Sequence, residues 1–184
     1  LYHRQIQAAL KIIGCDAPVA VHYSFVVLGS GSMSTRQGNL VLMADFVKEA
    51  KRKATTELRT RSHEINPQIA KAVAYSALKY SFLRVANDKQ IVFDWDKAMS
   101  FEGESGPYLL YSHARICSIL RRYNHRLPTT ADYSVLKAKE ELELIKLIAD
   151  LPDYIARTLR VRSPHVLAGY TFSLARHFSI FYHA

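Results

Sequence analysis

Apolar residues recur every three or four positions through most of this chain, which is the spacing of an amphipathic helix. The first such stripe consists of Ile6, Ala9, Leu10 and Ile13. Gly14 follows directly and is a natural helix stop. Residues 19–28 abandon the helical period and are rich in Val, Tyr and Phe, which is typical of a buried strand. The chain is therefore predicted to open with a helix followed by a strand.

Helices are predicted for nearly all of the remaining chain. A further helix is expected from Ala44 to Arg59, and after it Pro follows a capping-type residue at three places, a pattern that marks helix starts. The helices predicted from these signals are 67–86, 107–123, 132–149, a short piece after Pro152, and 164–183. Residues 87–101 and 124–130 are the predicted connections. The fold class is thus mainly α, with a helical bundle in the C-terminal two thirds.

A glycine- and serine-rich loop, residues 29–38, separates the predicted strand from the next helix. Small hydroxyls, free backbone N–H groups and the guanidinium of Arg36 can together stabilise charge on a phosphate under attack. The Gly-Lys-Ser/Thr ending of a Walker loop is absent from the segment. Its composition alone leaves two interpretations open: a phosphate-closing loop, or a flexible turn between a strand and a helix.

The charge balance narrows the choice of partner. The chain has 25 Lys and Arg against 16 Asp and Glu, a net charge of +9, which favours a polyanion such as nucleic acid. An anionic membrane is disfavoured, because no apolar run reaches the roughly 20 residues that span a bilayer. Cys15 and Cys117 are too few and too far apart for a disulfide framework or a zinc site, so a reducing, cytoplasmic compartment is expected.

One helix carries a candidate surface for RNA. Tyr108, Tyr111, Arg115 and Arg122 lie three, four and seven positions apart, so they share one helix face. Tyrosine rings and guanidinium planes stack on unpaired bases and hold phosphates. The ordinary alternative is equally compatible with the spacing: tyrosines that are half buried, and arginines that complement the helix dipole.

The segment from Phe93 to Arg115, FDWDKAMSFEGESGPYLLYSHAR, closely resembles the junction at which the catalytic half of arginyl-tRNA synthetases enters the anticodon-binding domain. Residues 32–36, SMSTR, resemble the KMSKS signature loop of class I synthetases in its arginyl form. Ser32 and Thr35 occupy the two lysine positions of that signature, which leaves Arg36 as the nearby cation. The resemblance implies the end of a Rossmann-type catalytic domain (1–65), a connecting helical region (66–106) and a truncated anticodon-binding bundle (107–184).

The same resemblance implies roles for particular residues. The catalytic loop residues are Met33, Ser34, Thr35 and Arg36. The ATP-binding residues are His22, Tyr23, Gly31 and Ser32. The tRNA-binding residues are Tyr108, Tyr111, Arg115 and Arg122. ATP and substrate-bound Mg²⁺ are the expected cofactors, with no metal held by the protein itself.

The implied activity is that of an arginine–tRNA ligase, which attaches arginine to its tRNA at the expense of ATP. Because the chain opens at Leu1 without an initiator Met and holds no HIGH-like signature, we expect it to be an inactive fragment of a monomeric parent enzyme. Two alternatives stay open at this stage. One is a non-catalytic tRNA-binding protein with an arginyl-type helical domain, and the other is a basic helical module without RNA specificity.

Overall fold

The computed structural model describes residues 2–28, 42–61, 64–123, 125, 130 and 132–184. Within them the elements follow in the order α1 Tyr2–Ile12, β1 Val26–Leu28, α2 Met43–Arg59, α3 Pro67–Leu83, β2 Ile91–Phe93, α4 Trp95–Met99, α5 Gly106–Tyr123, the 3₁₀ turn η2 Tyr133–Val135, α6 Lys139–Ala149, α7 Leu151–Val161 and α8 His165–His183. The prediction of a mainly α chain is confirmed.

The strands are shorter than the sequence pattern predicted, and one was missed. Of the predicted strand 19–28 only Val26–Leu28 pairs, in parallel with Ile91–Phe93. Both β2 and α4 lie in a segment predicted as a connection. A three-residue strand carries too little pattern to be recognised, because it exists only through its pairing with a segment far away in the sequence.

Three helices also differ from their predicted bounds, the first being α3, which ends at Leu83 and not at residue 86. The helix expected from residue 132 begins at Lys139, because Asp132 accepts a hydrogen bond from the Ser134 N–H at 2.9 Å and holds a separate 3₁₀ turn. The side chain of Glu141 then accepts the N–H groups of Lys137 and Ala138, both at 2.9 Å, and caps α6. The segment after Pro152 is a full helix, α7, and not a short piece.

An aromatic and alanine-rich core joins α2, α3, β2 and α4. The ring of Phe46 on α2 lies 4.7 Å from the rings of both Phe93 and Trp95, measured between centroids. Alanines at the contact between α2 and α3 let the two helix backbones approach closely; these are Ala50, Ala54, Ala74 and Ala77. The core therefore includes residues on both sides of the predicted boundary at residue 65.

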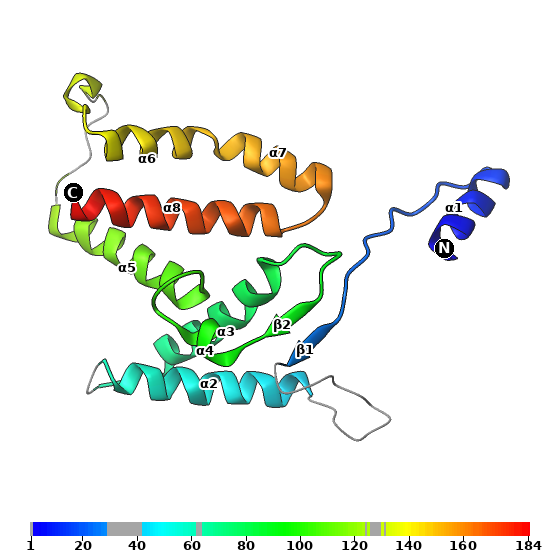
Figure 1. Cartoon of the computed structure of the whole chain (residues 1–184), viewed down its shortest axis with the longest axis horizontal. Coiled ribbons are helices and arrows are strands. Elements are labelled where there is room, and N and C mark those ends of the chain that lie inside the picture. The colour runs from blue at the N-terminus through cyan, green and yellow to red at the C-terminus, as the bar shows by residue number, and fades with distance from the viewer. Residues whose placement is uncertain (1, 29–41, 62–63, 124, 126–129, 131) are drawn as a thin grey trace.

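A second layer of helices completes the molecule. Figure 1 shows α8 between α5 and the pair formed by α6 and α7, and all three helices contact it. The Tyr170 hydroxyl donates to the Leu147 carbonyl at 3.0 Å, and its ring lies 4.6 Å from that of Tyr154.

No helix of the described part of the chain is long and apolar enough to cross a bilayer.

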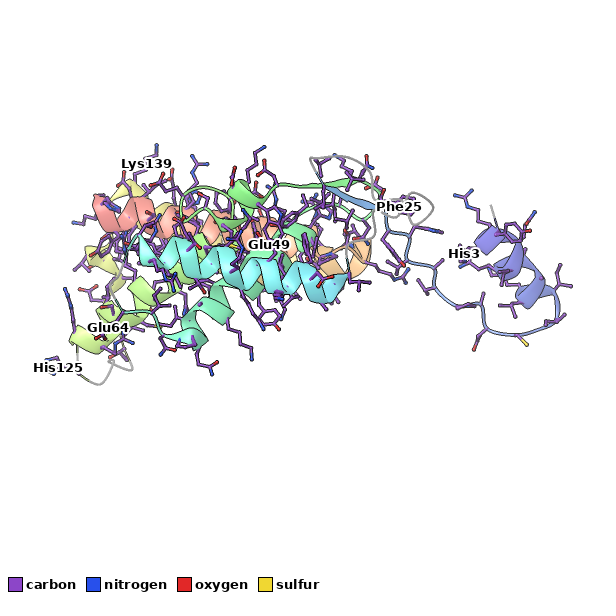
Figure 2. All side chains as sticks on the ribbon, turned by 90° about the horizontal axis from the view of Figure 1, so that it is seen from below. His3, Phe25, Glu49, Glu64, His125 and Lys139 are labelled. Carbon is purple, nitrogen blue, oxygen red and sulfur yellow. The ribbon has the colours of Figure 1, made fainter. Side chains whose placement is uncertain are left out.

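Helix α1 lies apart from this body, at the end of an extended segment (Figures 1 and 2). Among the described residues, side chains of the helix contact that segment at two places. Gln7 Nε2 donates to the Pro18 carbonyl at 2.9 Å, and the His3 and His22 rings meet edge to face at 5.3 Å. Helix α1 thus contacts the extended residues that lead into β1.

Helices α3 and α5 cross at a position that only glycine fits. A Cβ placed on Gly106 would lie 2.1 Å from the carbonyl oxygen of Ser76 and 2.7 Å from the N of Ala77. The obstacle is helix backbone, which cannot rotate aside as a side chain would. Gly106 therefore sets the distance between the core and the start of α5.

Gly106→Ala is expected to destabilise the protein by roughly 1–3 kcal/mol, because overpacking a tight helix crossing forces the backbones apart. Gly169→Ala in α8 is the matched control, since nothing lies within 4 Å of a Cβ there. The control should stabilise by about 0.5–1 kcal/mol, the usual gain from replacing a helical glycine. Urea unfolding of both variants measures the difference, and equal stabilities would contradict the close crossing.

Candidate nucleic-acid interface

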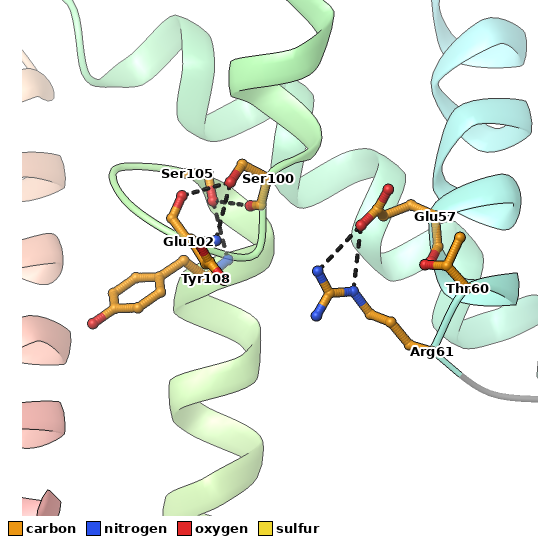
Figure 3. Close-up of polar contacts among 7 residues, drawn as sticks. All are labelled: Glu57, Thr60, Arg61, Ser100, Glu102, Ser105 and Tyr108. Carbon is orange, nitrogen blue, oxygen red and sulfur yellow. Dashed lines mark hydrogen bonds and ion pairs between the residues drawn. The ribbon is translucent and has the colours of Figure 1, made fainter.

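A serine-based turn fixes where α5 begins (Figure 3). Ser105, 1% exposed, donates its hydroxyl to the Ser100 carbonyl and accepts the Tyr108 N–H at 3.2 Å. Ser100 in turn donates to the Glu102 carbonyl at 2.6 Å and accepts the Glu102 N–H at 3.0 Å. The residue before Pro107 is Gly106, but the side chain that caps the helix is that of Ser105. The turn orients the whole face that was predicted to bind RNA.

Tyr108, the first residue of that face, points toward α8 (Figure 3). Its ring lies 5.7 Å from the ring of Phe172, and the side chain is half-buried. The tyrosine therefore belongs partly to the contact between α5 and α8.

Arg115 lies one turn of α5 after Tyr111. Its guanidinium contacts two tyrosine rings, that of Tyr111 and that of Tyr182. Its guanidinium carbon is 4.7 Å from the centroid of the Tyr111 ring and 4.8 Å from that of Tyr182 on α8. Arg115 Nη2 also donates to the Tyr111 hydroxyl at 2.5 Å. This arrangement fixes a normally mobile cation, while Tyr111 remains 48% exposed. Tyr182 was not predicted, because it lies on a different helix far along the sequence.

Arg122 lies in the last turn of α5, where its side chain is exposed. The last turn also holds Arg121, so the exposed end of the helix is cationic. His113, by contrast, faces Cys117, with 3.5 Å between Nε2 and Sγ. Tyr111, Arg115 and Arg122 thus lie along α5, whereas the Tyr108 ring packs against α8.

The predicted ATP-binding and catalytic residues are only partly covered by the structure. His22 and Tyr23 are exposed on the extended segment before β1, and Tyr23 is 88% exposed. Gly31, Ser32, Met33, Ser34, Thr35 and Arg36 lie outside the described residues. In the described part of the chain, no three His, Cys, Asp or Glu side chains gather as a metal site would require.

Glu104, one residue before the Ser105 cap, lies in a polar cluster with Arg84 and Tyr80 of α3 and its C-terminal end. It accepts hydrogen bonds from Arg84 Nη1 at 2.9 Å and from the Tyr80 hydroxyl at 3.3 Å. Burial of the phenol, followed by the nearby Glu104 carboxylate, raises the pKa of Tyr80 well above its usual range, and Arg84 opposes this effect. The cluster connects α3 to the turn that starts α5.

Comparison with known proteins matches both parts of this architecture. Residues 1–95 match the family described as tRNA synthetases class I (R), catalytic domain, and residues 109–184 match the DALR anticodon binding domain. The two matches thus define the class of protein, which is the class I tRNA synthetases. The chain covers the place where the catalytic domain of such a protein meets the anticodon-binding domain. Within that class, the chain belongs to the family of class I (R) synthetases.

Individual relatives agree with this assignment. The chain is 39% identical to an arginine–tRNA ligase of Methanosphaerula palustris over 183 residues, which cover 97% of this chain and 32% of that protein. It is 36% identical to one of Clostridium beijerinckii, covering 100% of this chain and 33% of that protein. The arginyl-tRNA synthetase structure of Thermus thermophilus superposes with a TM-score of 0.88 at 30% identity, covering 99% of this chain and 31% of that one. The chain spans about a third of the length of these relatives.

Alkaline pH should destabilise the fold through Tyr80. A phenol whose pKa is raised on folding contributes stability that is present below its unfolded value and lost as pH rises past it. Above about pH 10 the loss should reach up to about 1.4 kcal/mol per pH unit, and Tyr80→Phe should lessen it. Urea unfolding between pH 8 and 11 measures this slope. Tyr133→Phe, at a tyrosine that is 73% exposed, should leave the slope as in the parent chain.

Proposed function

We propose that this chain works as part of an ATP-dependent arginine–tRNA ligase, to which it contributes the nucleotide-closing loop and part of the grip on the anticodon arm. The observation that carries the proposal is that the catalytic segment and the anticodon-binding segment are joined in one chain. A class I (R) catalytic segment continues directly, through the turn at Ser105, into a helix that presents Tyr111 and Arg115. The names of the relatives supply the amino acid.

The exposed side of α5 is the proposed contact for the tRNA anticodon arm. Tyr111 offers a ring to an unpaired base, and Arg115, held by the Tyr111 and Tyr182 rings, offers its free edge to a base or a phosphate. Arg122 extends the positive surface toward the helix end. Tyr108 supports the same face through Phe172, and its own contact with RNA stays a prediction.

The nucleotide end of the proposed site consists of His22 and Tyr23 beside adenine, with Gly31, Ser32, Met33, Ser34, Thr35 and Arg36 as the loop that closes on ATP and Mg²⁺. Backbone N–H groups and the Arg36 guanidinium would stabilise charge on the reacting phosphate. We place the protein in the cytoplasm and expect a monomer with arginine, ATP and tRNA as its ligands. The boundaries at residues 65 and 106 remain part of this proposal.

Arginine-dependent ATP–pyrophosphate exchange, stimulated by tRNA, is the test of activity in a protein of the relatives' full length that contains this chain. The 184-residue chain alone should not catalyse it. If the longer protein binds tRNA but shows no exchange, the chain belongs to a non-catalytic tRNA-binding protein. The serine and threonine at the two signature lysine positions, Ser32 and Thr35, are the observation that favours this second candidate.

The chain itself should prefer arginine tRNA to other tRNAs. Base contacts discriminate between RNAs, whereas attraction to phosphate charge alone does not. A gel-shift competition at moderate salt measures the preference. Equal competition by all tRNAs would reduce the protein to a basic helical module.

Tyr111→Ala and Arg115→Ala are each expected to weaken tRNA binding by roughly 1–3 kcal/mol, the usual value of a stacked base. Each change also releases the other partner of the stack, so the double variant should lose less than the sum of the two. Fluorescence anisotropy with labelled tRNA measures the affinities. Tyr133→Ala, at an exposed tyrosine of the same half of the chain, is the control and should bind as the parent does.

A further inference from the structure

A surface cleft lies where the two family segments of the chain meet. It is lined by residues 20–22, 86–88, 160–163 and 165, with a volume of about 370 Å³. The first two stretches lie in the segment that matches the catalytic domain, and the third lies in the anticodon-binding segment. Parts of the chain that are far apart in sequence therefore form one concave site.

Asn87 holds the walls of the cleft together. Its carbonyl accepts the Ser24 N–H at 2.8 Å, and its side-chain Nδ2 donates to the Arg162 carbonyl at 3.0 Å. Its Oδ1 accepts the hydroxyl of Ser163 at 2.9 Å, and Ser163 is only 7% exposed. Since these contacts reach two distant stretches of chain, Ser24 before β1 and the Arg162–Ser163 pair before α8, the cleft is a built feature and not a gap between independent segments.

The hydrogen bonds also orient a histidine. The Ser163 hydroxyl has one proton, which it donates to Asn87, so it accepts from His165 Nδ1, 2.7 Å away. The proton of a neutral His165 ring therefore lies on Nδ1, and Nε2 has no further contact among the described residues. In the cationic ring both nitrogens donate, so the ring can then bind an anion through Nε2.

The charged side chains of the cleft lining have a positive balance, among Ala, Val, Ser and Asn residues that are uncharged. Arg160 and Arg162 contribute two guanidinium groups and His22 and His165 two imidazoles, against one carboxylate, Asp88. Within the described part of the chain neither arginine forms an ion pair. The backbone of Arg162 has a φ of 52°, the left-handed conformation that ends α7. The fold therefore sets the point from which the Arg162 side chain starts.

We propose that this cleft binds a backbone phosphate of the tRNA, at the corner where the RNA passes from the catalytic segment to the anticodon-binding segment. The inference rests on the proposed function. An RNA that contacts both segments must cross their junction, and guanidinium pairs match phosphate oxygens in geometry and charge. Residues on both sides contribute, so the site exists only when the two segments are docked.

The test uses Arg160→Gln and Arg162→Asn in the 184-residue chain, because asparagine tolerates the left-handed conformation at residue 162. Each variant should weaken tRNA binding and lower the slope of log affinity against log salt by about 1, the value of one lost phosphate contact. Arg157→Gln, one turn earlier on α7 and outside the cleft, is the matched control and should change the slope less. Circular dichroism checks that the helices persist.

The inference is overturned if the slope of log affinity against log salt is unchanged in the two cleft variants, or if Arg157→Gln lowers it equally. Either result leaves the proposed tRNA-binding function standing. A parent chain that binds no tRNA would instead contradict the proposed function. In that case a pyrophosphate titration followed by NMR of the His22 and His165 rings decides: shifts that disappear in Arg160→Gln support a phosphate site, and no shifts overturn it. If ATP moves these rings while the tRNA slopes stay unchanged, the ligand is a nucleotide and the RNA assignment is wrong.

Discussion

The close crossing of α3 and α5 at Gly106 is the constraint on which the rest of the arrangement depends. Backbone lies directly against backbone there, so the two helices meet at a fixed distance. The buried turn of Ser100 and Ser105 then sets the direction in which α5 leaves the core. Because α8 packs on α5, and α6 and α7 pack on α8, this crossing helps to place the second layer, together with the hydrogen bonds from Asn87 to the turn before α8.

The second consequence is preorganisation of the cationic surface. A free arginine loses about 2 kcal/mol of rotamer freedom when it is immobilised by a ligand. Arg115 has already lost much of that freedom in its position between Tyr111 and Tyr182. The stacked guanidinium thus meets a partner at lower entropic cost than a solvated arginine would. The fold thereby converts a common surface residue into an oriented one.

Much of the helical framework was predictable, because helix periodicity and capping are local. The helix start predicted at residue 67 is confirmed, and Asn66 caps it, with its side chain accepting the Gln68 N–H at 2.8 Å. The short strands β1 and β2 were not predictable as a pair, since each depends on a partner more than sixty positions away. Likewise, nothing adjacent in sequence indicates that Arg84 and Tyr80 contact Glu104.

The helical class, the positive charge and the shared face of Tyr111 and Arg115 could be read from the amino-acid sequence alone, and so could the synthetase family, through the long match around residues 93–115. These are properties of local spacing or of recognisable motifs. Three contacts depend on the packing of the helices: Tyr108 lies against Phe172, Tyr182 completes the stack on Arg115, and Asn87 joins the turn before α8 to the extended segment before β1. Each of these contacts joins residues that are distant along the chain, so it exists only once the helices have packed.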